Sequence, residues 1–377
     1  MTLVPALPVI AEPRVRFADL RVFDDDERRA LLAATQTVLE HGRLINGPEV
    51  AILEKRLAKR AGRNYAVGLG SGSEALALAL RALDIGPGAE VITSAVSWVA
   101  TANAIHLVGA TPVFADVDEG YNIDPASVRR VISPRTKAIM GVHYAGRPYD
   151  AATIDLIAAE YRLHHLEDGS QAFGGAGFGR PVGGAGRIAC CSANPMKLLA
   201  ATGEAGFALC DDVELYDRLL RLRYNGVLPG DLLCREPASN ARLDTLQAAM
   251  LLVRLDRLDE AIACRKQLAR RYMERLGDVA RFPPPFDGVN AYFLFPIRIM
   301  AMERDRLVAH LNANGVEARS RATDFLPLHP PFHNCRGEWR RAEALIAETL
   351  FTPIHGRMTP ADVDLVANLI IDFIKGR

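Results

Sequence analysis

Hydrophobic and polar positions follow two different periods along the chain. Between Tyr65 and Leu209, short apolar runs alternate with stretches whose apolar residues recur every three to four positions. The apolar runs predict seven strands: Tyr65–Gly68, Glu90–Thr93, Thr111–Ala115, Lys137–Val142, His164–Glu167, Ile188–Ser192 and Gly206–Leu209. The stretches between them predict helices at Ser73–Leu83, Trp98–Leu107, Ala126–Ile132 and Ala151–Tyr161. Strands separated by such helices form a mostly parallel sheet with helices on both faces, so the pattern predicts an α/β fold with a seven-stranded sheet.

The pattern changes on both sides of this region. A helix is predicted at Asp24–His41, and a long helical stretch runs from Leu243 to Leu276. Three prolines then interrupt the chain, and further elements are predicted beyond them: a strand in Ala291–Ile299, a helix at 302–314, a strand near Val316–Arg319 and a terminal helix at Ala361–Lys375. We therefore expect residues 1–255 to form an N-terminal arm and a large domain, and residues 256–377 a smaller α+β domain.

Composition narrows the class of protein. The 377 residues are 49% hydrophobic and 24% charged, which is enough apolar material for large cores. Lys plus Arg and Asp plus Glu are both 45, so no net charge favours nucleic acid or an anionic membrane surface. The six cysteines form no CxxC pair and the histidines do not stand at zinc-ligand spacing, so no metal site is expected. The first residues have no basic leader, and no apolar run approaches the roughly 18 residues that span a bilayer. These features favour a cytoplasmic protein whose cysteines are free, buried thiols.

The first stretch with candidate chemistry is GLGSGSEALALALRAL, which begins at Gly68. Here a strand leads through a Gly/Ser turn into a helix, and the free N–H groups of a helix start can bind phosphate. A dinucleotide-binding fingerprint would need a third glycine where Ser73 stands, which argues against a nicotinamide-dependent oxidoreductase. The alternative is an ordinary glycine-rich turn.

Two further residues stand at strand ends. Asp168 follows a buried strand in HHLEDGSQAFGG, at the edge of the sheet where α/β proteins bind ligands. It could equally be a helix N-cap. Lys197 follows Ser192 in a loop of apolar and small residues, and a desolvated lysine has a lowered pKa and can form a Schiff base. Most lysines, however, are solvated surface residues.

Together these three features match the needs of one cofactor. Pyridoxal 5'-phosphate requires a phosphate cradle, a carboxylate at its pyridine nitrogen and a lysine for its aldehyde. An aromatic side chain covering the ring would complete the site, and Trp98 is the candidate, although it could also be an ordinary aromatic at a helix start.

At this level of detail the chain resembles the DegT/DnrJ/StrS family of pyridoxal-phosphate-dependent sugar aminotransferases, which have the aspartate aminotransferase-like fold type I. The resemblance covers nearly the whole length. It is carried by the segments NGPEVAILEKRLAKRAGRNYAVGLGSGSEALALAL, WVATANAIHLVGATPVFADVD, HLEDGSQAFGG, SANPMKLLAATGEAGFALC, SNARLDTLQAAM and TPIHGRMTPADVDLVANLI.

The resemblance implies roles for individual residues. Lys197 matches the Schiff-base lysine and Asp168 the acid at the pyridine nitrogen, so these two are the predicted catalytic residues. The other predicted cofactor-binding residues are the phosphate ligands Gly72, Ser73 and Ser192, the stacking residue Trp98, Gln171 near the 3-hydroxyl, and Asn240. The family's matching asparagine reaches the phosphate from the neighbouring subunit, which implies a homodimer with shared active sites.

The implied activity is transfer of an amino group from glutamate or glutamine to a keto sugar, in amino-sugar or antibiotic biosynthesis. The wording of PMKLLAATGEAG is similar to the branch acting on a 3-oxo-glucose phosphate, and a nucleotide-linked keto sugar is the other option. The family usually has Thr where Ser73 stands, and often an aromatic residue and His or Tyr where Ala193 and Asn194 stand.

Proteins that share this fold can have other activities. An aminocyclitol aminotransferase is one alternative. A sugar dehydratase of this fold would have His in place of Lys197, and a non-catalytic regulatory relative should have lost part of the site. Five residues could meet an anionic group of the substrate or could be structural neighbours: Arg43, Arg223, Tyr224, Asn225 and Arg319.

Overall fold

A computed structural model of the chain describes residues 12–228, 230–231 and 233–376. The first eleven residues lie outside this range. They include part of the predicted N-terminal arm and the segment in which no leader was found.

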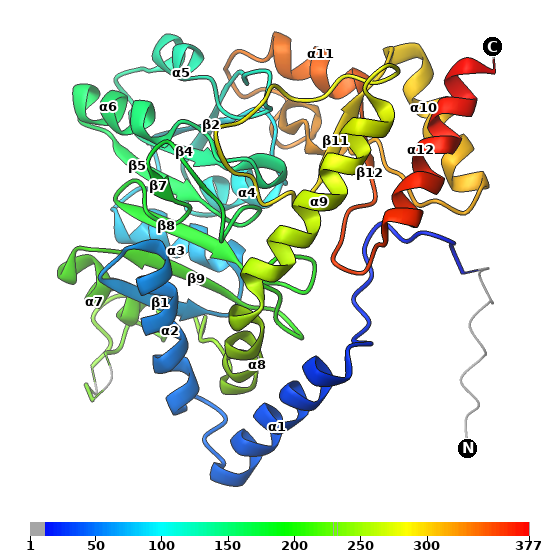
Figure 1. Cartoon of the computed structure of the whole chain (residues 1–377). Helices are drawn as coiled ribbons and strands as arrows, with labels where there is room; N and C mark the ends of the chain where they lie inside the picture. Colours follow the sequence, from blue (N-terminus) through cyan, green and yellow to red (C-terminus); the bar gives the residue numbers. More distant parts are fainter. Residues whose placement is uncertain (1–11, 229, 232, 377) are drawn as a thin grey trace, which may run out of the picture.

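The centre of the molecule is a seven-stranded sheet in the order β1-β9-β8-β5-β4-β2-β3 (Figure 1). β9 pairs antiparallel with both β1 and β8, and the other described pairs of this sheet are parallel. All seven predicted strands are present, so the α/β fold with a mostly parallel sheet is confirmed. The strands are β1 (Tyr65–Leu69), β2 (Glu90–Ser94), β3 (Thr111–Ala115), β4 (Thr136–Val142), β5 (His164–Asp168), β8 (Ile188–Ser192) and β9 (Gly206–Cys210).

Side chains on the two faces of this sheet enter separate cores. Along β1, Val67 and Leu69 pack into a core with α3, α4 and α7, whereas Ala66 points to the opposite core with α2 and α8. On that second face, Ile92 and Val113 of the other half of the sheet pack against α5 and α6. Both faces are buried, which explains why these strands are continuous apolar runs.

The helices of this large unit begin at residues suited to capping. The Asp24, Ser71 and Asp150 side chains accept hydrogen bonds from backbone N–H groups in the first turns of α1, α3 and α6. Neither α2 nor α7 is among the helices predicted from periodicity. The bounds are α1 (Asp25–His41), α2 (Pro48–Ala61), α3 (Gly72–Ala82), α4 (Ala100–Leu107), α5 (Pro125–Val131), α6 (Ala151–Tyr161), α7 (Val213–Arg223) and α8 (Thr245–Asp256).

The long predicted helix is two helices. α8 ends at Asp256, Arg257 leaves helical geometry with φ −102° and ψ 1°, and α9 (Leu258–Leu276) continues toward a smaller unit. Figure 1 shows α9 running from the large sheet to this unit. Its other elements are β11 (Phe295–Arg298), α10 (Ala301–Ala313), α11 (Arg340–Glu348), β12 (Thr349–Thr352) and α12 (Pro360–Lys375).

The small unit has its own core. β11 and β12 pair antiparallel, and their side chains pack with those of α9, α10 and α12 around Tyr272 and Leu350. The prediction of a strand near Val316–Arg319 is wrong. Val316 forms only an isolated bridge to Val15, and Arg319 forms one to Phe351. The division at residue 255 stays a prediction. Short strands β6 (Ala176–Gly177), β7 (Arg180–Pro181) and β10 (Gly288–Val289) form a third sheet, and three 3-10 turns lie at Tyr144–Gly146, Ala322–Asp324 and Leu326–Leu328.

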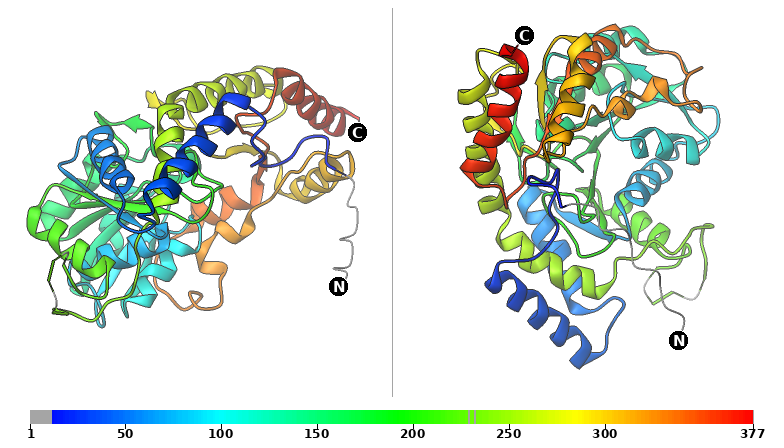
Figure 2. Two further views of the ribbon diagram at one scale, coloured as in Figure 1. Left: turned by 90° about the horizontal axis from the view of Figure 1, so that it is seen from below. Right: turned by 90° about the vertical axis from the view of Figure 1, so that its right-hand side faces the viewer.

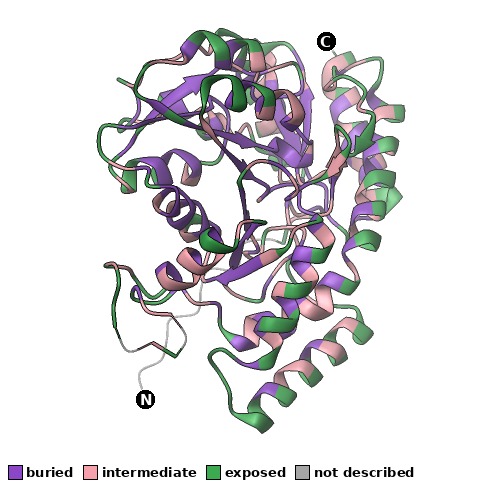
Figure 3. Ribbon diagram, turned by 90° about the vertical axis from the view of Figure 1, so that its left-hand side faces the viewer, coloured by how far each residue is buried: buried purple, intermediate pink, exposed green. Residues whose placement is uncertain are grey.

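The N-terminal segment joins the two units. Val15 enters the core of the small unit, and the Phe17 N–H donates to Glu317 Oε2 at 2.7 Å. Figure 2 shows α1 lying along α8, where Glu27 of α1 pairs with Arg254. Only Leu31 and Val38 of α1 are buried, so the helix is largely exposed (Figure 3).

The structure also bears on the expectations for the cysteines and for membrane-spanning segments. The expectation of buried free thiols is confirmed for Cys190, Cys191 and Cys210. It is wrong for Cys234, which is exposed, and Cys264 and Cys335 are only partly buried. Within the described part of the chain, no helix combines the length and apolarity needed to cross a membrane.

Candidate active site

A cavity of about 330 Å³ lies between the carboxyl edge of the large sheet and the small unit. Parallel strands bring their carboxyl ends to one edge, so loops far apart in the sequence meet there. The volume falls within the roughly 300–1,000 Å³ typical of small-molecule sites. The predicted site residues that line it are Gly72, Ser73, Trp98, Asp168, Gln171, Ser192, Lys197 and Arg319.

The first turn of α3 forms one end of the cavity. Ser71 caps the helix by accepting from the Glu74 N–H at 3.1 Å, which leaves the N–H groups of Gly72 and Ser73 without intrahelical partners. A methyl group on Gly72 would lie 2.4 Å from Ser192 Cβ. Only glycine therefore lets α3 approach the end of β8, and the result is a helix start flanked by the Ser73 and Ser192 hydroxyls, which is suited to an anion.

The Asp168 carboxylate is held from two sides. Its Oδ1 accepts from the Ser170 N–H at 3.0 Å, and its Oδ2 accepts from Thr101 Oγ1 at 3.1 Å. Thr101 in turn lies 2.9 Å from the Ser97 hydroxyl. Asp168 is buried, and the described residues directly after it form a turn and not a helix, so the alternative of a helix N-cap is wrong. The carboxylate instead closes a turn and borders the cavity in a fixed orientation.

Lys197 reaches the same cavity from the loop after β8. Its Nζ lies 4.7 Å from the centroid of the Phe293 ring, within the range of a cation–π contact. Loss of solvation lowers the pKa of Lys197 to about 8; Arg321 nearby acts in the same direction, and Asp168 opposes it. A larger fraction of this amine than of a surface lysine is therefore neutral, and free to accept a proton, near neutral pH.

Trp98 and Gln171 complete the predicted set around the cavity. Trp98 is half exposed in the loop between β2 and α4, as a side chain covering a bound ring would be. Gln171 is buried, and its Oε1 accepts from the Ala145 N–H at 2.9 Å.

Sequence reasoning missed most of the opposite wall. This wall comes from the N-terminal segment, α9 and the small unit, and includes Phe17, Arg265, Arg321, Ile354 and His355. Arg265 Nη1 donates to three backbone carbonyl oxygens, the nearest being that of Ile354 at 2.7 Å. Burial lowers the pKa of Arg265 to about 10. No local pattern distinguishes these residues, because they meet only through tertiary packing.

Four predicted residues of the α7 region lie outside this cavity. Arg223 pairs with Glu54 at 2.8 Å, which is a structural contact within the large unit. The Tyr224 ring lies under the Arg242 guanidinium at 3.8 Å, and Asn240 Oδ1 accepts from Arg242 Nε at 3.0 Å. Asn225 is exposed beside them.

Arg43, in the loop before α2, also lies outside, and its N–H donates to His41 Nδ1 at 3.0 Å. The roles assigned to these five residues stay predictions, and for Asn240 the predicted contact involves a neighbouring subunit.

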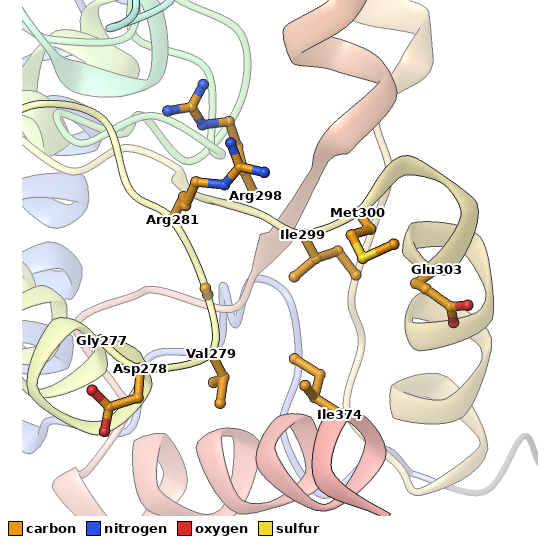
Figure 4. A pocket seen from close by; sticks show the side chains of 10 residues that line it. Gly277, Asp278, Val279, Arg281, Arg298, Ile299, Met300, Glu303 and Ile374 are labelled. Carbon is orange, nitrogen blue, oxygen red and sulfur yellow. The ribbon is translucent and has the colours of Figure 1, made fainter. Parts of the chain in front are cut away.

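A second hollow of about 350 Å³ lies within the small unit (Figure 4). Val279, Ile299 and Ile374 point into it, while Arg281 and Arg298 extend to one side. It contains none of the predicted site residues, so the cavity at the sheet edge is the candidate active site.

Comparisons with known proteins agree with this assignment. Residues 25–371 match the model of the DegT/DnrJ/EryC1/StrS aminotransferase family. The chain is 35% identical over 349 residues to dTDP-3-amino-3,4,6-trideoxy-alpha-D-glucose transaminase of Streptomyces venezuelae, covering 91% of each chain. It is 33% identical to UDP-2-acetamido-2-deoxy-3-oxo-D-glucuronate aminotransferase of Pseudomonas aeruginosa, covering 93% of this chain and 98% of the relative. The solved structure of NtdA from Bacillus subtilis with bound cofactor PMP has a TM-score of 0.90 at 28% identity, covering 97% of this chain and 86% of that one.

The seven-stranded sheet, with Lys197 and the buried Asp168 at its carboxyl edge, has the fold of the solved aminotransferase structures to which the chain is similar. The chain belongs to the DegT/DnrJ/EryC1/StrS family, and it is an aminotransferase. The predicted family is thus confirmed.

Proposed function

We propose that this protein is a pyridoxal-phosphate-dependent enzyme that transfers an amino group from glutamate or glutamine to a keto sugar in amino-sugar or antibiotic biosynthesis. The observation that carries the proposal is the meeting of Lys197, Asp168 and the start of α3 in one cavity. The expected absence of a metal and of a nucleic-acid partner, and the cytoplasmic location, stay predictions.

The residues present fit pyridoxal phosphate. The cradle between Gly72 and Ser192 would be filled by a single Cβ, so its openness is specific to the glycine. Free N–H groups and two hydroxyls there suit a phosphate, and the buried Asp168 carboxylate suits a protonated ring nitrogen. Lys197, with its lowered pKa, suits an aldehyde.

The mechanism divides between these residues. When bound, the cofactor supplies a ring that accepts electrons from the carbon losing its proton. Lys197 Nζ would take that proton as general base and return it as general acid, a role that a pKa of about 8 supports near neutral pH. Asp168 would hold positive charge on the ring nitrogen, and Thr101 and Ser170 fix the carboxylate for this task. Because these donors are already in place, little reorganisation is needed during reaction.

The acceptor is proposed from the relatives. Two of them act, by their names, on dTDP- and UDP-linked amino or keto sugars, which favours a nucleotide-linked keto sugar over a sugar phosphate. An aminocyclitol aminotransferase is less favoured for the same reason. Retention of Lys197 and Asp168 argues against a dehydratase or a non-catalytic regulatory relative.

The activity test uses the purified protein loaded with pyridoxal phosphate. Adding glutamate or glutamine should change the visible absorbance, and 2-oxo acid should be released. A panel of keto sugars, free, phosphorylated and nucleotide-linked, is then added. Only the class of keto sugar that the enzyme accepts should restore the original spectrum. No spectral change with any amino donor would overturn the proposed function.

We also propose a homodimer with shared sites, with Asn240 serving the partner's phosphate. Large apolar side chains are exposed on α1, on the following loop and on α2, as an interface would require: Leu32, Leu39, Leu44, Ile45 and Ile52. Exposed Asn240 lies outside the cavity of its own chain, which is consistent with service to another.

Mixed dimers test this arrangement. Lys197→Ala and Asn240→Asp homodimers should both be poor enzymes, because one lacks the base and the other sets a carboxylate against a phosphate. After subunit exchange, one site of each mixed dimer has both residues intact, and activity should return to at most one site per dimer. No recovery, with exchange verified by mass, would refute the shared site.

A further inference from the structure

The loop between Arg319 and Asp324 places two arginines with different environments on the small-unit wall of the cavity. Arg319 and Arg321 both line it. The Arg319 guanidinium lies 4.4 Å above the centroid of the Phe17 ring and forms no ion pair with the described carboxylates. Arg321 is fixed by two hydrogen bonds to Asp324, from Nε to Oδ2 at 2.8 Å and from Nη2 to Oδ1 at 3.0 Å.

Asp324 is itself held rigidly. Its side chain is fully buried, and its Oδ2 also accepts from the Tyr144 hydroxyl at 2.6 Å. Tyr144 is fully buried as well, and the Asp324 carbonyl oxygen accepts from the Ser97 N–H next to Trp98. The pair is therefore anchored to the edge of the large sheet.

The Arg321 backbone has an uncommon conformation, which it shares with eight other described non-glycine residues. Its φ of 46° lies in the left-handed region that a residue with a Cβ seldom adopts. Strained positions of this kind concentrate at ligand sites, where surrounding contacts hold them. Here the contact that holds it is the Asp324 pair.

Hydrogen-bonding capacity remains on Arg321. A guanidinium has five N–H groups, and Asp324 accepts two of them. Even if the neighbouring Tyr144 oxygen accepted with both lone pairs, at least one N–H would remain for the cavity. Arg321 thus offers fixed donors, while Arg319 offers a positive charge that no described carboxylate neutralises.

We infer that Arg319 and Arg321 bind an oxyanion of a substrate, with Asp324 and Tyr144 as positioning residues that fix Arg321. The inference rests on the proposed function, since both substrates of that reaction offer such groups: the amino donor has carboxylates, and a nucleotide-linked sugar has phosphates. Arginine suits either, because its planar N–H groups match two oxygens at once.

Equilibrium binding of unreactive probes tests the inference. Glutarate stands for the donor's carboxylates, and inorganic phosphate and thymidine diphosphate stand for the acceptor; each is titrated into the cofactor-loaded enzyme by calorimetry. Arg321→Gln should weaken at least one probe by about tenfold or more, the loss expected for a charge-assisted hydrogen bond. Loss for glutarate alone identifies the donor carboxylate, and loss for the phosphates alone identifies the acceptor. Arg130→Gln is the matched control, because it removes an exposed arginine paired with Glu338 far from the cavity.

Asp324→Asn separates positioning from net charge. Removing the carboxylate makes the cavity wall more positive, so charge alone would tighten anion binding, whereas loss of positioning would weaken it. We expect weaker binding and a raised KM for the same substrate, with little change in kcat at pH 9, where Lys197 is mostly neutral with or without the Asp324 charge that raises its pKa. Tyr144→Phe should also raise KM, by a smaller factor. It tests the same positioning role if Asp324→Asn lowers the Tm too far for measurement.

The outcomes distinguish failure of the proposed function from failure of the oxyanion subsite. If the unaltered enzyme shows no spectral change with amino donors, the proposed function fails. If it does react, and either binds none of the probes or binds them equally well as Arg321→Gln, the oxyanion subsite alone is overturned. Tighter anion binding by Asp324→Asn overturns the positioning role.

Discussion

The two walls of the cavity are built in different ways. The large-unit wall comes from the ends of parallel strands and the helix starts that follow them, so Gly72, Asp168 and Ser192 are fixed by the sheet. The small-unit wall comes from the N-terminal segment, α9 and two loops, and its polar members include three arginines and His355. Most groups proposed to hold the cofactor therefore lie at strand ends or at a helix start, and Lys197 follows in the loop after β8. Arg319 and Arg321, proposed for substrate recognition, lie on an irregular segment, where changes disturb the sheet least.

Replacing Lys197 with alanine tests the large-unit wall most directly. Loss of a general acid–base group should slow the reaction with glutamate by between about 10²- and 10⁴-fold. Borohydride reduction followed by peptide mass mapping should find the cofactor adduct on Lys197 in the native protein and no adduct in the variant. An adduct on another lysine in the native protein would contradict the assignment.

Asp168→Asn should have the next largest effect. The substitution keeps the shape but removes the charge that would stabilise a protonated ring nitrogen, and such a bond contributes about 1.5–3 kcal/mol. The reaction with glutamate should therefore slow at least tenfold, measured by stopped-flow absorbance at saturating cofactor. A native rate in this variant would leave Asp168 with only its turn-closing role.

The pH dependence of the reactivity of the Lys197 amine tests whether the large-unit wall desolvates it. Its pKa is lowered to about 8, so the neutral amine increases as the pH rises through 8. Pyridoxal phosphate is added to the cofactor-free protein, and the adduct on Lys197 is reduced with borohydride. The rate of adduct formation should rise about tenfold between pH 7 and pH 9 and then level off. Continued increase beyond pH 10 would show an ordinary, solvated lysine.

Trp98 should give the smallest effect, because it is half exposed and contributes stacking alone. Trp98→Leu should weaken cofactor binding by about 0.5–1.5 kcal/mol, the usual contribution of an aromatic pair. Trp98→Phe, which keeps a ring, is the matched control and should stay close to native affinity in a reconstitution titration. Equal losses in both variants would mean that Trp98 does not stack on the cofactor.

The large sheet and most of its wall of the cavity could be predicted from the pattern of residues along the chain. Strands buried on both faces must be continuous apolar runs, and all seven were therefore visible before the structure. Gly72, Asp168 and Lys197 could also be singled out, because each stands next to such a run and parallel strands end at one edge. The break at Arg257 was not visible, since the apolar period continues from α8 into α9.

The opposite wall, apart from Arg319, could not be predicted from local sequence patterns. Arg265 and Arg321 are separated from each other and from Lys197 by more than fifty residues, and nothing in their local sequence differs from that of surface arginines. Phe17 reaches the cavity because Val15 is buried in the small unit, a contact between distant parts of the chain. Periodicity indicates which face of a helix or strand is buried, but it carries no information about which loops come into contact in the fold. The small-unit wall is formed by such contacts between loops that are distant in the sequence.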